Sequence, residues 1–195
     1  MARKQQPEEL TREHRWALLL LPIAGLAVLG CIAYWNSTDV PFVFDDMLTI
    51  QRNPGVHFDD YFRLSQYVNT RSLLFLTFAI NNRLGGQNVL GYHLVNLGLH
   101  ILNGILIFGI ACQIFRKVEV EKTRARLFAF CAAAFFLVHP VQTEAVTYIS
   151  SRSELLSAFF YLIGLGCFVA FPENKIGFLA SLAVLVSLLL GFGGK

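Results

Sequence analysis

Two adjacent acids, Asp45 and Asp46, follow a long apolar segment by about ten residues. Phe42, Val43 and Phe44 come directly before them, so we expect the pair to lie at a bilayer surface, where unused charge is costly. One carboxylate can accept a proton from an attacking hydroxyl, and repulsion between neighbouring acids raises the proton affinity of one of them. Asp45 is the preferred base, and Asp46 would orient the acceptor or hold a divalent cation. The alternative is a solvated acidic pair in a loop.

Other catalytic chemistries have less support in the sequence. A zinc site would need ligand spacing on one helix turn, and only His93 has neighbours at such spacing, Asn96 and His100. Asparagine is a poor zinc ligand, so we predict no metal site of this type and no certain cofactor. The cysteines fall inside apolar segments at unrelated spacings, and Ser and Thr residues lack a Gly-rich nucleophile elbow.

The composition is that of a membrane protein. The chain has 195 residues, of which 55% are hydrophobic, 13% aromatic and only 15% charged. Its net charge of +3 is small, and basic residues are not clustered with aromatic ones on one face. We therefore expect a lipid bilayer and no nucleic acid among its partners.

The candidate residues must be positioned by helices that cross this bilayer. A charge-free run of about 20 residues is long enough to span a hydrocarbon core of about 30 Å. We predict an all-α polytopic membrane protein: a cytoplasmic tail at 1–15, then a membrane domain at 16–195 with about five transmembrane helices, at about 16–35, 93–115, 125–140, 155–171 and 176–192. External loops would cover 36–92 and 140–154. The first loop contains an amphipathic helix at 72–84, too short to cross, which we expect in the interface plane.

A polar stripe marks the second predicted span. His93, Asn96, His100 and Asn103 recur at intervals of three, four and three. At 100° per residue they fall within an arc of roughly 80°, which should face other helices and not lipid. They either form hydrogen bonds between helices or contact a substrate.

Basic residues fix the predicted orientation. Ten basic residues lie in the tail and in the two loops assigned to the inner side, and five lie in the external loops. The amino terminus is therefore expected in the cytoplasm and the first loop outside it. The short tail without a cleavable signal favours a bacterial inner membrane over the endoplasmic reticulum.

Several motifs occur in a recognisable order. They are Phe44-Asp45-Asp46, Asn53-Pro54, the segment from Gly91 to Asn96 with His100 and Asn103, and His139-Pro140 followed by Glu144, Ser150, Arg152 and Leu155-Leu156-Ser157. This order resembles the amino-terminal part of GT-C glycosyltransferases. It is most similar to the transmembrane O-mannosyltransferases that target cadherins and to bacterial counterparts with tetratricopeptide repeats. The resemblance implies a partial GT-C bundle, with Asp45 and Asp46 as the catalytic acids.

The resemblance also implies the substrates. A sugar, plausibly mannose, would pass from a polyprenyl- or dolichyl-phosphate carrier to a hydroxyl of an acceptor protein outside the cytoplasm. Positive charge or hydrogen-bond donors must then meet the leaving phosphate. The substrate-binding candidates are Arg152, Arg71, Glu144, His139 and His93, for each of which a structural role is the alternative.

Family members have more spans and usually a soluble repeat domain. Lys195 lies where they commonly have a Lys-Glu pair, so we expect an amino-terminal part of such an enzyme. Two other interpretations stay open: a non-catalytic membrane subunit, and a transporter fragment whose polar stripe lines a path.

Overall fold

A computed structural model describes residues 12–56, 71–171, 184–187 and 189. Within these residues the fold is entirely helical, without strands. The main helices are α1 (Arg12–Tyr34), α3 (Ser72–Gly85), α4 (Val89–Lys117), α5 (Lys122–Val138), α6 (Thr143–Thr147) and α7 (Arg152–Ala170). Short helical turns connect them: η1 (Trp35–Ser37), η2 (Met47–Gln51), η3 (Pro54–Val56), η4 (Pro140–Gln142) and η5 (Ile149–Ser151).

Three of these segments are long and apolar enough to cross a membrane: Leu20–Ser37, Val89–Lys117 and Ile149–Ala170. Helix α5 and the following Pro140–Thr147 segment, bent by 50°, form a fourth if they are counted together. An integral multi-pass membrane protein made of helices is therefore confirmed. The expected fifth span, 176–192, lies almost wholly outside the described residues, so the number five and the partial GT-C bundle stay predictions.

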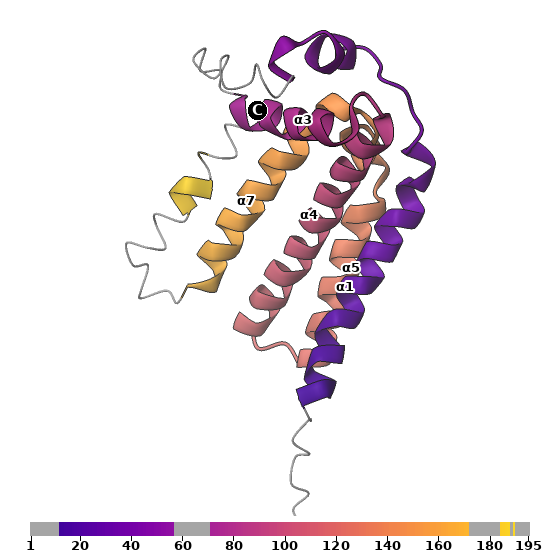
Figure 1. The fold of residues 1–195 in the computed structure, drawn as a ribbon. Helices are drawn as coiled ribbons and strands as arrows, with labels where there is room; N and C mark the ends of the chain where they lie inside the picture. The colour runs from indigo at the N-terminus through magenta and orange to yellow at the C-terminus, as the bar shows by residue number, and fades with distance from the viewer. Residues whose placement is uncertain (1–11, 57–70, 172–183, 188, 190–195) are drawn as a thin grey trace, which may run out of the picture.

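Helix α4 is the centre of the bundle, packed against α1, α5 and α7 (Figure 1). Small residues allow the close approaches. A Cβ added at Gly104 of α4 would lie 2.8 Å from the Leu137 side chain of α5, and one at Gly30 of α1 would lie 2.7 Å from Ile101. Helices in a membrane associate largely through this close packing of small residues.

Helix α3 covers one end of the bundle. It runs across the ends of α4 and α7 instead of alongside them (Figure 1). Its buried Leu74 and Phe78 pack with Tyr92 of α4 and Ile149 in a single core cluster. The amphipathic helix predicted at 72–84 is confirmed as a helix, and its apolar face covers protein.

The polar stripe of α4 forms hydrogen bonds between helices. All four of its residues are buried, and each bonds to another segment: His93 to the Val40 carbonyl, Asn96 to the Tyr148 and Ile149 carbonyls, His100 to the Leu137 carbonyl and Asn103 to the Leu155 carbonyl. The His100 bond shows why polar groups are needed here. Helix α5 ends at Val138, and the Val141 N–H bonds to the His139 side chain instead of continuing the helix. The Leu137 carbonyl therefore has no hydrogen-bond partner within its own helix, and His100 Nε2 donates to it.

Candidate functional site

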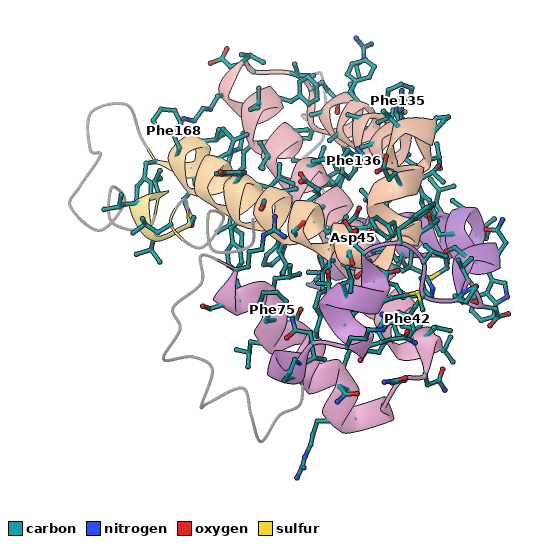
Figure 2. All side chains as sticks on the ribbon, turned by 90° about the horizontal axis from the view of Figure 1, so that it is seen from above. Phe42, Asp45, Phe75, Phe135, Phe136 and Phe168 are labelled. Atoms are coloured by element: carbon teal, nitrogen blue, oxygen red, sulfur yellow. The ribbon has the colours of Figure 1, made fainter. Side chains whose placement is uncertain are left out.

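A cavity of about 440 Å³ opens where the two predicted external loops meet. Its lining comes from the 45–49 segment, the start of α3, and the 141–154 segment: Asp45, Thr49, Arg71, Leu74, Val141, Glu144, Ala145, Tyr148, Ser150, Ser151, Ser153 and Glu154. Figure 2 looks down on this end of the bundle, with Asp45 near the middle of the view. Residues about one hundred positions apart in the chain therefore share one hollow.

The two adjacent acids have different environments. Asp46 is 1% exposed. Its Oδ1 accepts hydrogen bonds from the Ser150 N–H, at 2.8 Å, and from the Ser150 hydroxyl, while its Oδ2 accepts from the Val43 N–H at 3.2 Å. Asp45 is exposed and lines the cavity. The interior acid fixes the loop, and the carboxylate next to it is free to meet a ligand.

The backbone at Phe44, directly before the two acids, has an unusual conformation. Phe44 has a φ of 47°, the left-handed region that side chains other than glycine rarely adopt. Its own ring is 85% exposed and packs edge-on against Tyr148, with ring centroids 6.5 Å apart. The Asp45 N–H donates to the Tyr148 hydroxyl at 3.1 Å. Non-glycine residues in this conformation are uncommon and occur at turns and at functional sites.

Glu144 and Arg71, both predicted as substrate-binding residues, line the cavity together with Asp45. Glu144 lies in the first turn of α6, and Arg71 is the residue before α3. Glu154, for which the sequence predicts no role, also lines the cavity from the first turn of α7. Three carboxylates and one guanidinium thus surround a space also bordered by serine hydroxyls.

Arg152 is not among the lining residues, because its side chain points into the bundle and is fully buried. Its Nε donates to Asn96, its Nη1 to Asn81 and Thr77, and its Nη2 to the Tyr92 carbonyl. The guanidinium also lies 4.6 Å from the centre of the Phe78 ring. These bonds join α3, α4 and α7 through one buried side chain. Asn81 and Thr77 were not selected from the sequence, although their spacing of four residues on a short helix placed both on one face.

The two histidines also have structural partners. His93 Nε2 donates to the Val40 carbonyl at 2.8 Å, and the ring is buried. His139 Nδ1 accepts from the Val141 N–H at 3.2 Å and so caps η4, the structural alternative that the sequence left open. Neither ring lines the cavity. A substrate contact by either histidine stays an untested prediction.

No group of three or more His, Cys, Asp or Glu side chains within the described ranges is arranged to hold a metal ion. The divalent cation suggested for the acid pair stays a prediction. Asp46 has both its oxygens occupied by protein donors, so Asp45 is the member of the pair that remains open to a ligand.

Helices long and apolar enough to cross a membrane, with an acidic cavity at one end, define a polytopic membrane protein with a candidate ligand site. The sequence is 35% identical over 199 residues to protein O-mannosyl-transferase TMTC4 of Homo sapiens, covering 90% of this chain and 26% of that protein. It is 31% identical over 156 residues to TMTC3 of Mus musculus and over 169 residues to Tmtc3 of Drosophila melanogaster, in each case covering 73% of this chain. No family model and no solved structure matches. The chain is thus homologous to the N-terminal part of the TMTC protein O-mannosyl-transferases, and the family resemblance seen in the sequence is confirmed.

The chain spans about a quarter or less of the length of these curated relatives, with 26%, 16% and 18% of their residues covered. The match includes most of the described helices but leaves the larger part of each relative without a counterpart here. The similarity therefore shows that this chain is related to mannosyltransferases.

Proposed function

We propose that this chain forms the acceptor-activating part of a membrane glycosyltransferase that moves mannose from a polyprenyl- or dolichyl-phosphate carrier to a hydroxyl of a protein. The acceptor oxygen attacks the anomeric carbon and forms the new C–O bond. The bond between that carbon and the phosphate oxygen breaks, and the phosphate keeps the electron pair. The Asp45 carboxylate accepts the hydroxyl proton.

The observation that carries this proposal is the contrast between Asp45 and Asp46. A general base must reach the proton that it removes, and Asp45 is the acid that faces the cavity. Asp46 is held by Ser150 and by the Val43 N–H, so its role is to position the loop. Glu144 and Glu154 line the same space.

Arg71 is the cation best placed to meet the leaving phosphate. It is exposed and lines the cavity, whereas the Arg152 side chain is buried inside the bundle and does not line it. Phosphate carries charge that a guanidinium can bind through two parallel N–H groups. The role of Arg152 is then to position α3 against α7, since it donates from α7 to Thr77 and Asn81 of α3.

The position of the cavity fits a lipid-linked donor. The cavity lies at the end of the bundle covered by α3, and the basic connection between α4 and α5 lies at the other end (Figure 1). By the positive-inside rule the cavity then faces the extracytoplasmic side. We assign this side to the periplasm of a bacterial inner membrane, with the endoplasmic reticulum lumen as the eukaryotic equivalent.

The test is sugar transfer in proteoliposomes. The wild-type protein and the Asp45→Asn variant are supplied with labelled polyprenyl-phosphate mannose, and both bound donor and labelled protein are measured. We expect Asp45→Asn to lower transfer by at least about 100-fold, the contribution typical of a general base, while donor binding is retained. Glu119→Gln, which removes an exposed acid far from the cavity, is the matched control.

Full transfer by Asp45→Asn would show that this residue is not the base. A wild-type protein that transfers no sugar but moves solute across the liposome membrane would favour the transporter interpretation. The hydrogen bonds from the polar stripe of α4 to neighbouring segments support the transferase proposal over that interpretation.

A further inference from the structure

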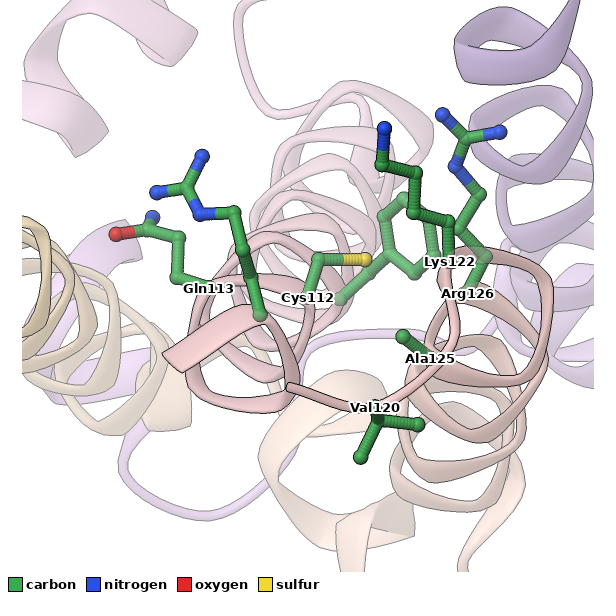
Figure 3. A pocket seen from close by; sticks show the side chains of 8 residues that line it. Cys112, Gln113, Val120, Lys122, Ala125 and Arg126 are labelled. Carbon is green, nitrogen blue, oxygen red and sulfur yellow. The ribbon is translucent and has the colours of Figure 1, made fainter. Parts of the chain in front are cut away.

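A second cavity, of about 460 Å³, lies at the opposite end of the bundle from Asp45, between the last turns of α4 and the first turns of α5. Three cationic side chains line it: Arg116 from α4, and Lys122 and Arg126 from α5. Figure 3 shows Lys122 and Arg126 extending on the same side of the hollow, with the Cys112 thiol pointing toward them. The cations are therefore gathered around one space.

No acidic side chain among the described residues pairs with any of these three cations. Within the described residues, none of their side chains makes a hydrogen bond or an ion pair. The nearest acid in the connection, Glu121, accepts from the Thr123 and Arg124 N–H groups and so caps α5. Concentrated, uncompensated positive charge in a hollow attracts an anion.

The wall of this cavity is apolar. Phe108, Ala125 and Val120 line it beside the cations. Leu127 and Phe128, which follow directly on α5, are both more than half exposed, and an exposed apolar surface on a spanning helix faces lipid. A soluble anion gains little from such a wall, whereas a phospholipid places its phosphate among the cations and its acyl chains along the apolar helix.

We infer that this cavity, lined by Arg116, Lys122 and Arg126, is a binding site for the headgroup of an anionic phospholipid in the leaflet at the basic end of the bundle. Basic pockets between spanning helices are suited to such headgroups. The site is separate from the cavity at Asp45 and does not depend on glycosyltransferase activity. Its effect would be to hold α4 and α5 together where their connection is most positively charged.

Cys112 provides a direct reporter, because it is half-buried in the wall. The full chain carrying Cys31→Ala, Cys131→Ala and Cys167→Ala would be reconstituted in nanodiscs of phosphatidylcholine, with or without cardiolipin, and treated with N-ethylmaleimide, which is uncharged. We expect cardiolipin to slow the labelling of Cys112 several-fold. Equal rates in the two lipids would overturn the inference.

A matched pair of substitutions separates specific binding from surface charge. Arg126→Gln removes a lining cation, and Arg124→Gln removes the same charge two residues away, from a side chain outside the lining. We expect protection of Cys112 to be lost in Arg126→Gln and kept in Arg124→Gln. Equal protection of Cys112 in the two variants would show that only the total surface charge matters, and would contradict a defined site.

The source of the phosphate is tested separately. Glycerol phosphate added to phosphatidylcholine nanodiscs should leave the labelling of Cys112 unchanged. Protection equal to that by cardiolipin would assign the cavity to a soluble phosphate instead.

Native mass spectrometry gives an independent readout of bound lipid. Cardiolipin should stay on the wild-type protein and be lost from the triple variant Arg116→Gln, Lys122→Gln, Arg126→Gln, whose helical content is checked by circular dichroism. Retention by the triple variant would contradict the site.

Discussion

The Ser150 N–H donates to Asp46 Oδ1 at 2.8 Å, although the two residues are 104 positions apart in the chain. The Ser150 hydroxyl donates to the same oxygen. This pair joins the first loop to the short helical segment before α7, and so brings Asp45 over the cavity that Glu144 and Glu154 line from the other side. The site therefore depends on a contact between loops that the sequence separates widely.

The first prediction compares the two acids as folding determinants. Asp46→Asn replaces one acceptor oxygen by an amide that points at N–H donors, so we expect it to lower the free energy of unfolding by about 1–3 kcal/mol. Asp45→Asn should leave stability within about 0.5 kcal/mol, because this exposed side chain can be changed without breaking a buried bond. The measurement is unfolding by sodium dodecyl sulphate titration in mixed micelles.

Ser150→Ala provides the reciprocal variant for this comparison, since it removes the hydroxyl donor to Asp46. Ser153→Ala is its control, because Ser153 lines the same cavity without bonding to Asp46. Equal stability of Asp45→Asn and Asp46→Asn would contradict the division of roles between the two acids.

The second prediction concerns Arg152. Arg152→Met would leave the Asn81 and Asn96 acceptor oxygens buried without a donor, so we expect a loss of about 3 kcal/mol or more. Arg152→Lys should recover only part of this, because an ammonium cannot reproduce the planar set of donors. Arg124→Met, an exposed site, is the control. Thermal unfolding of all three variants in detergent is the measurement, and a stability of Arg152→Met equal to that of the control would contradict the structural role.

The sequence was sufficient for those features that depend on periodicity and composition. Apolar runs located α1, α4, α5 and α7, and the amphipathic segment predicted at 72–84 located α3. The apolar face predicted for that helix included Ile80 and Leu84, which are exposed, whereas Leu74 and Phe78 are buried. The stripe of α4 was found by its period, because four polar groups in an apolar helix must face protein. The carbonyl groups opposite the stripe, which lie in other segments, could not be identified from the sequence.

The details of the site depend on geometry between distant segments. Neighbouring residues in a loop give no sign of which one points inward, so the burial of Asp46 and the exposure of Asp45 could not be read from the sequence. The sequence predicted that Arg152 would meet the leaving phosphate, whereas its side chain is buried in the bundle. Its direction was not predictable, because Asn81 and Thr77 belong to a helix about 70 residues earlier in the chain.

The third prediction tests the close packing of α4 against α5. In Gly104→Ala the new methyl group would lie 2.8 Å from the buried Leu137 side chain, so we expect a loss of about 1–3 kcal/mol from overpacking. Gly109→Ala on the same helix meets no atom within 4 Å and should be neutral or slightly stabilising. Melting temperatures of the two variants in one detergent decide the question, and a lower value for Gly109→Ala would contradict this packing.

The fourth prediction concerns the start of α5, where Glu121 is the capping residue. The N–H groups of Thr123 and Arg124 donate to its carboxylate at 2.9 and 3.0 Å and lower its pKa below the ordinary value. A carboxyl whose pKa is lowered by folding adds stability above its unfolded pKa, about 4.3, and that stability is lost as the pH falls through the folded pKa.

The hydrogen-exchange protection of Thr123 and Arg124 should therefore fall on acidification in the wild-type protein. In Glu121→Gln it should be lower at neutral pH and nearly independent of pH, because the amide does not titrate. Glu119→Gln removes an exposed acid two residues earlier that makes no cap, and it should keep the wild-type profile. If Glu121→Gln also keeps the wild-type profile, the carboxylate does not cap α5, and Glu121 becomes available to pair with the cations that line the second cavity.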